Sequence, residues 1–249
     1  MNNRKLDIVP IVLHRLVADG AVERFDDFEV GSFSKLLQFC VEQSVSETSL
    51  GIAPFYNQKI LITFDDGNIT DFTVALPSLV AAKRSAVFFI VTDLIGRPNY
   101  MSWSQVRGLQ QNGMIVGSHS VSHLNLCDLE QDFQKKELVN SRNIIEDKLG
   151  VAVDAFSFPF GRFNSELLEL AKSAGYQYIF TSRHGLAHED TNFFPRNSLN
   201  SLMSHSTIRR TLEAKLSTRL YWFLEDSVKG HARDLLGDSL YRKIRDRVK

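Results

Sequence analysis

Residues 60–67, ILITFDDG in one-letter code, join a continuous apolar run to two adjacent carboxylates and a glycine. The apolar run from Lys59 to Phe64 predicts a strand. The stretch that follows, from Thr70 to Lys83, predicts a helix despite Pro77. A strand followed closely by a helix is the repeating unit of a parallel α/β sheet.

The same alternation continues on both sides of this unit. Further strands are predicted at 8–13, 86–91, 114–117, 155–158, 176–181 and 193–199. Helices are predicted at 33–41 with Ser32 as cap, 102–112 closed by Gly113, 129–149 ended by Gly150, and 165–173 before Gly175. About seven such units close or nearly close a barrel, so we expect an α/β fold with a (β/α) barrel over residues 1–203.

The remaining residues, 204–249, are predicted to form a C-terminal helical extension packed on the barrel. Residues 209–249 contain 11 basic and 6 acidic side chains. An apolar stripe is expected to pack on the core, and it comprises Leu212, Leu216, Leu220, Phe223 and Leu224. Contact of the basic extension with a membrane surface is the alternative, and we do not favour it.

Composition limits the classes of partner and compartment. Lys plus Arg and Asp plus Glu both total 29, so no net charge field would recruit nucleic acid. No stretch reaches the roughly 18–20 apolar residues that a membrane span needs, and the N-terminus has no signal-peptide pattern. Cys40 and Cys127 are the two cysteines, and Cys40 falls on the apolar face of a predicted helix. We therefore expect a cytoplasmic protein.

Polar residues that could carry chemistry follow several of the predicted strands. In α/β barrels these positions share the functional face. Asp65 and Asp66 follow one strand, and His119 and His123 follow another. Two histidines four apart with a carboxylate suit Zn²⁺ and leave coordination positions open, although each motif alone is more often a turn or a structural histidine. We expect a shared divalent-metal site, with zinc as the favoured ion.

Three segments in this order resemble the motifs of the polysaccharide deacetylases, carbohydrate esterase family four. They are residues 63–67 (TFDDG), His119 with His123, and residues 157–161 (SFPFG), within a similar region from Ile8 to Leu199. The resemblance implies a distorted barrel of about seven strands, a bound divalent metal, and hydrolysis of an acyl amide or ester on a sugar. It also implies that Asp65 is the catalytic base and that Asp66, His119 and His123 bind the metal.

The resemblance implies that Pro159, Phe160 and Gly161 bind the substrate. It also implies that the backbone N–H of Phe160 donates a hydrogen bond to the oxyanion that forms during hydrolysis. Many family members carry an arginine in this motif to orient the base, but the corresponding residue here is Ser157.

Residues 194–197 (FPRN) resemble a segment in a branch of the family that also lacks the third-motif arginine. The resemblance implies that Arg196 could supply the missing charge from another strand or contact the substrate, and an ordinary loop arginine is the alternative. His14 resembles a histidine that opens many such domains, and it is expected to be a catalytic acid or a substrate ligand, with a structural histidine as the alternative. His184, His188 and His205 are expected to be exposed loop residues.

The sequence therefore predicts an enzyme that removes an N-acetyl group from a sugar or glycan precursor, in bacterial envelope polysaccharide synthesis. Removal of a formyl group or an O-acetyl ester remains an alternative. The late motifs that supply the family's general acid have no clear match after Gly175. A non-catalytic, metal-retaining sugar-binding relative therefore also remains open.

Overall fold

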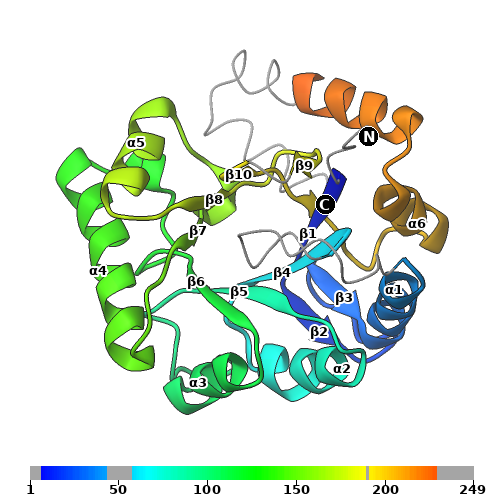
Figure 1. Ribbon diagram of the computed structural model, residues 1–249, viewed down its shortest axis with the longest axis horizontal. Helices are drawn as coiled ribbons and strands as arrows, with labels where there is room; N and C mark the ends of the chain where they lie inside the picture. The colour runs from blue at the N-terminus through cyan, green and yellow to red at the C-terminus, as the bar shows by residue number, and fades with distance from the viewer. Residues whose placement is uncertain (1–6, 44–57, 189–190, 229–249) are drawn as a thin grey trace, which may run out of the picture.

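A mostly parallel sheet curls into a nearly closed barrel in the computed structural model, which describes residues 7–43, 58–188 and 191–228 (Figure 1). The strand order is β10-β8-β7-β6-β5-β4-β1-β11, with β9 antiparallel to β1. The strands are β1 (Asp7–Leu13), β4 (Ile60–Asp66), β5 (Ala86–Ile90), β6 (Ile115–Ser118), β7 (Ala155–Ser157), β8 (Tyr178–Phe180), β9 (Ala187–His188), β10 (Phe193–Phe194) and β11 (Asn197–Ser198). The predicted fold class is confirmed.

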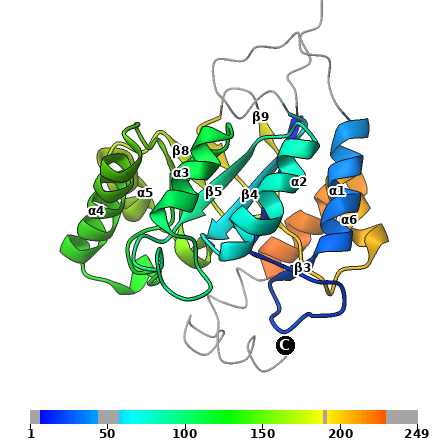
Figure 2. The same cartoon turned by 90° about the horizontal axis from the view of Figure 1, so that it is seen from below.

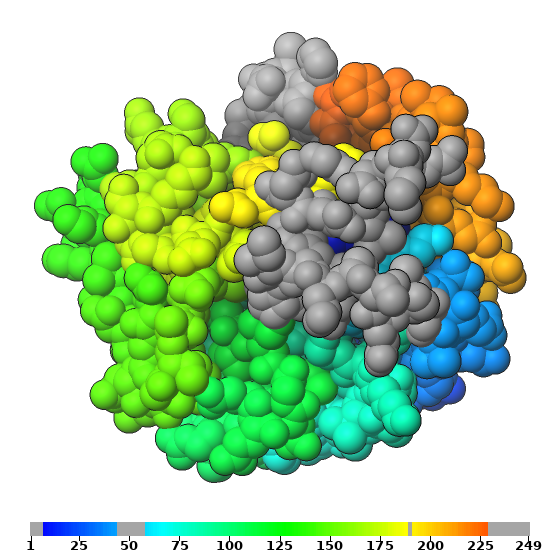
Figure 3. All heavy atoms as spheres, in the orientation of Figure 1, coloured from blue at the N-terminus to red at the C-terminus, as the bar shows by residue number. Residues whose placement is uncertain are grey.

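Helices surround this sheet in chain order, and the colours follow one another around the rim of the molecule (Figure 3). They are α1 (Val30–Glu42), the π-turn η1 (Asp71–Ala75) with α2 (Leu76–Ala81), α3 (Trp103–Gln111), α4 (Gln131–Leu149), α5 (Ser165–Ser173) and α6 (His205–Glu213). Pro77 lies in the first turn of α2, directly after η1.

Alternate residues of the central strands point to two different hydrophobic layers. Leu61 of β4 and Phe89 of β5 belong to one buried cluster, whereas their neighbours Ile62 and Phe88 belong to the larger cluster that includes apolar residues of the helices. The smaller cluster therefore fills the barrel interior. Asp65 is in phase with Leu61, because strand side chains alternate between faces.

The two edges of the sheet are joined by one short piece of chain. The predicted strand at 193–199 is broken: β10 pairs with β8, and β11 pairs with β1. Pro195 and Arg196 lie between the two pairings. The chain crosses from one edge to the other here, which brings the two ends of the sheet together and separates a single predicted strand into two.

The start of α1 differs from the prediction. The helix begins at Val30, so Ser32 lies inside its first turn and the predicted Ser32 cap is wrong. Asp19 serves this end instead, because its carboxylate accepts a hydrogen bond from the N–H of Gly31 at 2.8 Å. The strands β2 (Arg15–Val17) and β3 (Asp27–Glu29) just before α1 were not predicted.

The C-terminal helices lie at the side of the barrel near α1, as both ribbon views show (Figures 1 and 2). Leu212 of α6 is buried, and Trp222 is the buried residue of the helix at 216–228. The predicted stripe is wrong beyond Leu212, because Leu216, Leu220, Phe223 and Leu224 are 56–70% exposed.

The helix at 216–228 turns a different face to the barrel, because its contacts there come from Trp222 and Asp226. The division at residue 203 stays a prediction, and residues 229–249 lie outside the described part of the chain. Within the described part, no helix has the length and apolarity required to cross a membrane.

Candidate active site

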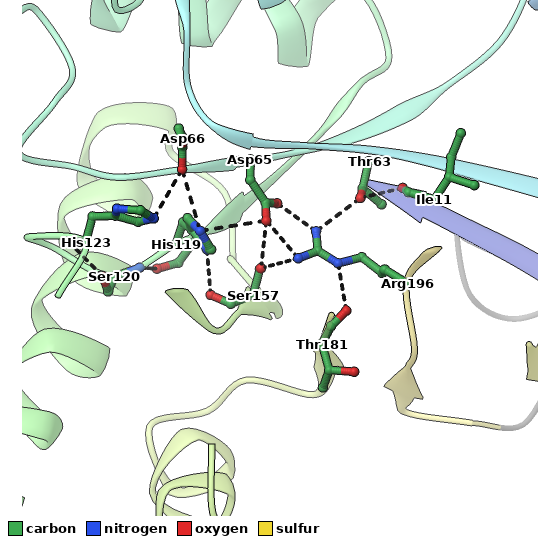
Figure 4. A network of polar contacts seen from close by, with 11 residues as sticks. Ile11, Thr63, Asp65, Asp66, His119, Ser120, His123, Ser157, Thr181 and Arg196 are labelled. Atoms are coloured by element: carbon green, nitrogen blue, oxygen red, sulfur yellow. Dashed lines mark hydrogen bonds and ion pairs between the residues drawn. The ribbon is translucent and has the colours of Figure 1, made fainter. Parts of the chain in front are cut away.

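Asp65 and Asp66 are the last two residues of β4, and their side chains take different directions (Figure 4). Asp65 is 3% exposed and points among interior residues, whereas Asp66 turns toward the loop that follows β6. The backbone of Asp66 has a φ of 79°, in the left-handed region, and Gly67 continues the turn with a φ of 80°. Strand alternation and this turn therefore separate the two adjacent carboxylates.

Arg196 is fully buried and holds both carboxylate oxygens of Asp65. Its two terminal nitrogens donate to Asp65 Oδ1 at 2.6 Å and to Asp65 Oδ2 at 2.7 Å. The guanidinium also donates to Ser157 Oγ, Thr63 Oγ1 and the carbonyl of Thr181. A fork of this kind fixes the orientation of a carboxylate as well as its charge.

The position of Arg196 changes its expected role and accounts for the absence of an arginine at position 157. Arg196 has no exposed surface, so the expectation that it contacts substrate is wrong. It supplies the positive charge that Ser157 cannot, from the crossover between β10 and β11. Burial of the Asp65 carboxyl opposes its ionisation, but the charge and hydrogen bonds of Arg196 outweigh that effect and hold its pKa well below its ordinary range.

Asp66 forms a second cluster with the two histidines. Asp66 Oδ1 lies 3.3 Å from His123 Nε2 and 3.7 Å from His119 Nε2. The ligand atoms of the three residues all lie within 4.8 Å of one another. Asp66 Oδ1 is buried, and no hydrogen-bond partner is present for it among the described residues. One carboxylate and two imidazoles around an unsatisfied buried oxygen fit a divalent ion such as zinc.

The imidazole of His119 is uncharged and has a fixed tautomer. Its Nδ1 lies 2.8 Å from the carbonyl oxygen of Ser157. A carbonyl can only accept, so Nδ1 carries the proton and the lone pair of Nε2 faces Asp66. Burial lowers the pKa of His119 to about 4, against the opposing effect of Asp65, so the ring is uncharged at neutral pH.

The loop between the two histidines has a constrained backbone. Ser120 and His123 have φ values of 69° and 58°, which non-glycine residues rarely adopt. Ser120 Oγ accepts from the N–H of His123 at 3.2 Å. Glu137 of α4 accepts from the N–H groups of Val121 and Ser122 at 2.9 and 3.0 Å, and from Ser122 Oγ at 2.7 Å. These bonds hold the loop in the shape that directs both imidazoles toward Asp66.

The remaining predicted site residues surround the same cluster. Phe160 is 57% exposed, and its ring centre lies 4.7 Å from that of His123. It has a φ of 59° between buried Pro159 and Gly161, so a tight turn presents it beside the histidine. His14 follows β1, and its Nδ1 is buried without a hydrogen-bond partner among the described residues. The structure thus brings His14, Phe160 and the cluster around Asp66 to one face of the barrel.

Sequence reasoning missed three residues near this site. Glu137 accepts hydrogen bonds from the loop between His119 and His123. Asp26 lies near His14 and Asp66, with a carboxylate oxygen within 4.8 Å of a ring nitrogen of His14 and a carboxylate oxygen of Asp66. Asp71 is fully buried just after the first motif. Glu137 and Asp26 carry no local motif, so only tertiary contacts reveal them. Asp71 had a signal, because it is an acidic residue on the buried side of a predicted helix.

The comparisons with known proteins agree with this geometry. The sequence pattern of the polysaccharide deacetylase family matches residues 54–179. YxkH of Bacillus subtilis (strain 168), whose name places it among the polysaccharide deacetylases, is 26% identical over 191 residues, which cover 75% of this chain and 68% of that protein. A peptidoglycan-N-acetylglucosamine deacetylase of Bacillus cereus is 26% identical over 151 residues, covering 60% of this chain and 67% of that one.

Among solved structures, the deacetylase PplD of Streptococcus pyogenes, determined with acetate, superposes with a TM-score of 0.71 and 22% identity. The superposition covers 84% of this chain and 99% of that protein. At this identity the likeness shows the fold alone. The family match spans half of the 249 residues and contains both carboxylates and both histidines. The chain therefore belongs to the polysaccharide deacetylase family.

Proposed function

We propose that this protein removes N-acetyl groups from a sugar or glycan precursor by metal-dependent hydrolysis, in the synthesis of a bacterial envelope polysaccharide. One observation carries the proposal: both oxygens of Asp65 are held by Arg196, while adjacent Asp66 presents a buried, unpartnered oxygen to the imidazoles of His119 and His123. Asp65 is fixed and ionised by its pairing with Arg196. Asp66 has no arginine or lysine partner among the described residues. A sugar N-acetyl substrate follows from the Bacillus cereus relative.

Asp66, His119 and His123 would hold the ion. When bound, a divalent ion supplies positive charge that polarises the acyl carbonyl and favours deprotonation of a water molecule. Asp65 accepts the proton of the attacking water. Arg196 keeps Asp65 ionised and prevents it from rotating, because both of its oxygens are fixed. The strong stabilisation also makes Asp65 a weak base, so it requires a water that is already acidified.

The acyl oxygen gains negative charge during the attack, and the N–H of Phe160 is the donor that we assign to it. His14 is the group that we assign to protonate the leaving amine. A ring nitrogen of His14 lies within 4.8 Å of carboxylate oxygens of Asp66 and Asp26, which is consistent with a proton-carrying role.

Measurement of acyl release tests this function. Chelator-treated protein should release acetate from N-acetylated sugar nucleotides and oligosaccharides only after Zn²⁺ or another divalent ion is added back. Release of formate, or of acetate from O-acetyl esters alone, would identify one of the other hydrolases. Undiminished activity after complete metal removal would refute the mechanism, and sugar binding without any acyl release would favour a non-catalytic relative.

The proposal includes a cytoplasmic location, in which the substrate would be a precursor or a lipid-linked intermediate. It rests on Cys40 and Cys127, which form no disulfide in the described part of the chain. Fractionation of cells that produce the full-length protein tests it directly.

A further inference from the structure

A cavity lies between the barrel wall and the C-terminal helices. Its volume is about 380 Å³, and it opens to solvent. The walls come from β11, from the chain after β8, and from α6 with the helix at 216–228. None of Asp65, Asp66, His119, His123 or His14 lines it. The cavity is therefore separate from the site described above.

The cavity wall has a distinctive chemistry. Most of its side chains carry a hydroxyl or an amide, as do Ser198, Thr207, Ser217 and Tyr221. Arg210 adds a permanent positive charge. No Asp or Glu is present among the described residues that line it. Hydroxyls can donate and accept, whereas a guanidinium only donates, so the wall favours a ligand with several hydroxyls and a negative charge.

One wall is held in place by hydrogen bonds between His184 and Asp226. The N–H of His184 donates to Asp226 Oδ2 at 2.9 Å, and His184 Nδ1 lies 2.8 Å from Asp226 Oδ1. Buried Trp222 stacks on the His184 ring with a centroid separation of 6.1 Å. His184 is thus a fixed wall residue, which corrects the expectation of an exposed loop histidine. With Nδ1 engaged by the carboxylate, Nε2 is the ring nitrogen left for a ligand.

The size of the cavity excludes a bare ion as its natural occupant. About 380 Å³ falls in the usual range for small-molecule sites, whereas a water-sized species occupies about 30 Å³. The Tyr221 ring offers an apolar face of the kind that packs against the C–H groups of a sugar. We propose that this cavity binds an anionic monosaccharide, that is, a sugar unit bearing a carboxylate or a phosphate.

Calorimetric titration of the full-length protein with four probes tests this inference: glucuronate, glucose 6-phosphate, glucose and inorganic phosphate. Chelator is present throughout, so that an ion near Asp66 cannot capture the anions. At least one of the two charged sugars should bind more tightly than both glucose and phosphate. The preference between carboxylate and phosphate identifies the source of the charge. Equal binding of glucose, or saturation by phosphate alone, would overturn the proposal.

Neighbouring arginines provide the matched variants. Arg210→Met should weaken binding of the charged sugar about tenfold or more, the scale of one charge-assisted hydrogen bond. Arg209→Met is the control, because Arg209 is 71% exposed, pairs with Glu213 and does not line the cavity. Tyr221→Ala should also weaken binding, and circular dichroism verifies that each variant is folded. Equal losses in the two arginine variants would indicate general charge attraction and refute a built site.

Discussion

Asp65 and Asp66 are consecutive residues, yet their surroundings are opposite. The oxygens of Asp65 are bonded to Arg196 and Ser157 inside the barrel. Asp66 faces two imidazoles, and its buried Oδ1 has no hydrogen-bond partner among the described residues. Strand alternation produces this difference, since neighbouring side chains leave β4 on opposite faces. A single strand end can therefore provide one fixed carboxylate that is ionised at neutral pH and a second carboxylate that faces a different group of residues.

The two surroundings also differ in where their positive charge comes from. Arg196 neutralises Asp65 within the protein. Beside Asp66 the nearest basic groups are His119 and His123, and burial keeps His119 neutral by lowering its pKa to about 4. An unpaired buried carboxylate is unfavourable. A cation from solution, as in the proposed mechanism, would therefore stabilise the Asp66 side, whereas the Asp65 side is already neutralised by Arg196.

Exchange of each carboxylate for its amide should show the largest contrast. Asp65→Asn retains the shape but removes the proton acceptor, so turnover should fall by about a hundredfold to ten-thousandfold while the metal stays bound. Asp66→Asn should lose the metal first. Acetate release and metal content, measured on both variants, check this result. Wild-type turnover in Asp65→Asn would exclude Asp65 as the base and leave His14 as the next residue to test.

Removal of Arg196 should leave Asp65 without its partner but should not change the contacts of Asp66 with His119 and His123. Arg196→Met leaves a buried carboxylate without its partner, so the free energy of unfolding should fall by about 3–5 kcal/mol. Urea denaturation measures this loss. Arg196→Lys is the matched variant, which keeps the charge but cannot form the two-pronged bond, and it should lie between wild type and Met. A stable Arg196→Met protein would show that the pair is not required for folding.

The stability that this pair provides should depend on pH. Its stabilisation is fully present above the unfolded pKa of Asp65, because the folded pKa is lowered by Arg196. It is lost as the pH falls toward the folded value. The difference between wild type and Arg196→Met should therefore shrink in acid, and unfolding curves at several pH values between neutral and strongly acidic check the sign.

Substitution of Glu137 should weaken metal binding without changing any of the three proposed ligands, because Glu137 supports the loop between the two histidines. Glu137→Ala removes three hydrogen-bond acceptor contacts from the histidine loop, so metal affinity should fall about 10- to 100-fold, the usual effect of losing a supporting partner. Glu137→Gln should have a smaller effect. Competition with a zinc chelator measures the affinity. The control is Asp147→Asn on the same helix, where the side chain is 79% exposed. Unchanged affinity in Glu137→Ala would show that the loop holds its shape without this anchor.

Local signals and tertiary contacts account for what the sequence could and could not predict. The α3 cap was predictable, because Ser102 and Gln105 form a capping box within four residues. The cluster of Asp66, His119 and His123 was predictable because two short motifs carry these residues. The Asp65–Arg196 pair joins residues 131 positions apart, and only a suggestion that Arg196 replaces a charge was available from sequence. The break between β10 and β11 depends on pairing with two different strands, which the continuous apolar pattern at 193–199 does not reveal.

The smallest predicted effect concerns Asp71, a buried carboxyl that resembles neither Asp65 nor Asp66. No hydrogen-bond partner for its oxygens is present among the described residues, and no arginine is bonded to it. Burial, and then the charges of Asp66 and Asp65, raise its pKa well above the ordinary value of 3.8. At low pH the carboxyl is protonated in both the folded and the unfolded chain. As the pH rises above 3.8, only the unfolded chain ionises, so the folded state is penalised.

Asp71→Asn removes this penalty and should stabilise the chelator-treated protein at neutral pH on the order of 1 kcal/mol, a common size for a stabilising substitution. The gain should be smaller near pH 4, because Asp71 is then largely protonated in both states. It should also shrink when Zn²⁺ is added, because a cation beside Asp66 offsets the negative charge that helps to raise the pKa of Asp71. Thermal unfolding at the two pH values, with and without metal, measures all three differences. A gain that is equal at both pH values would mean that Asp71 stays ionised in the fold, with a cationic partner that compensates for its burial.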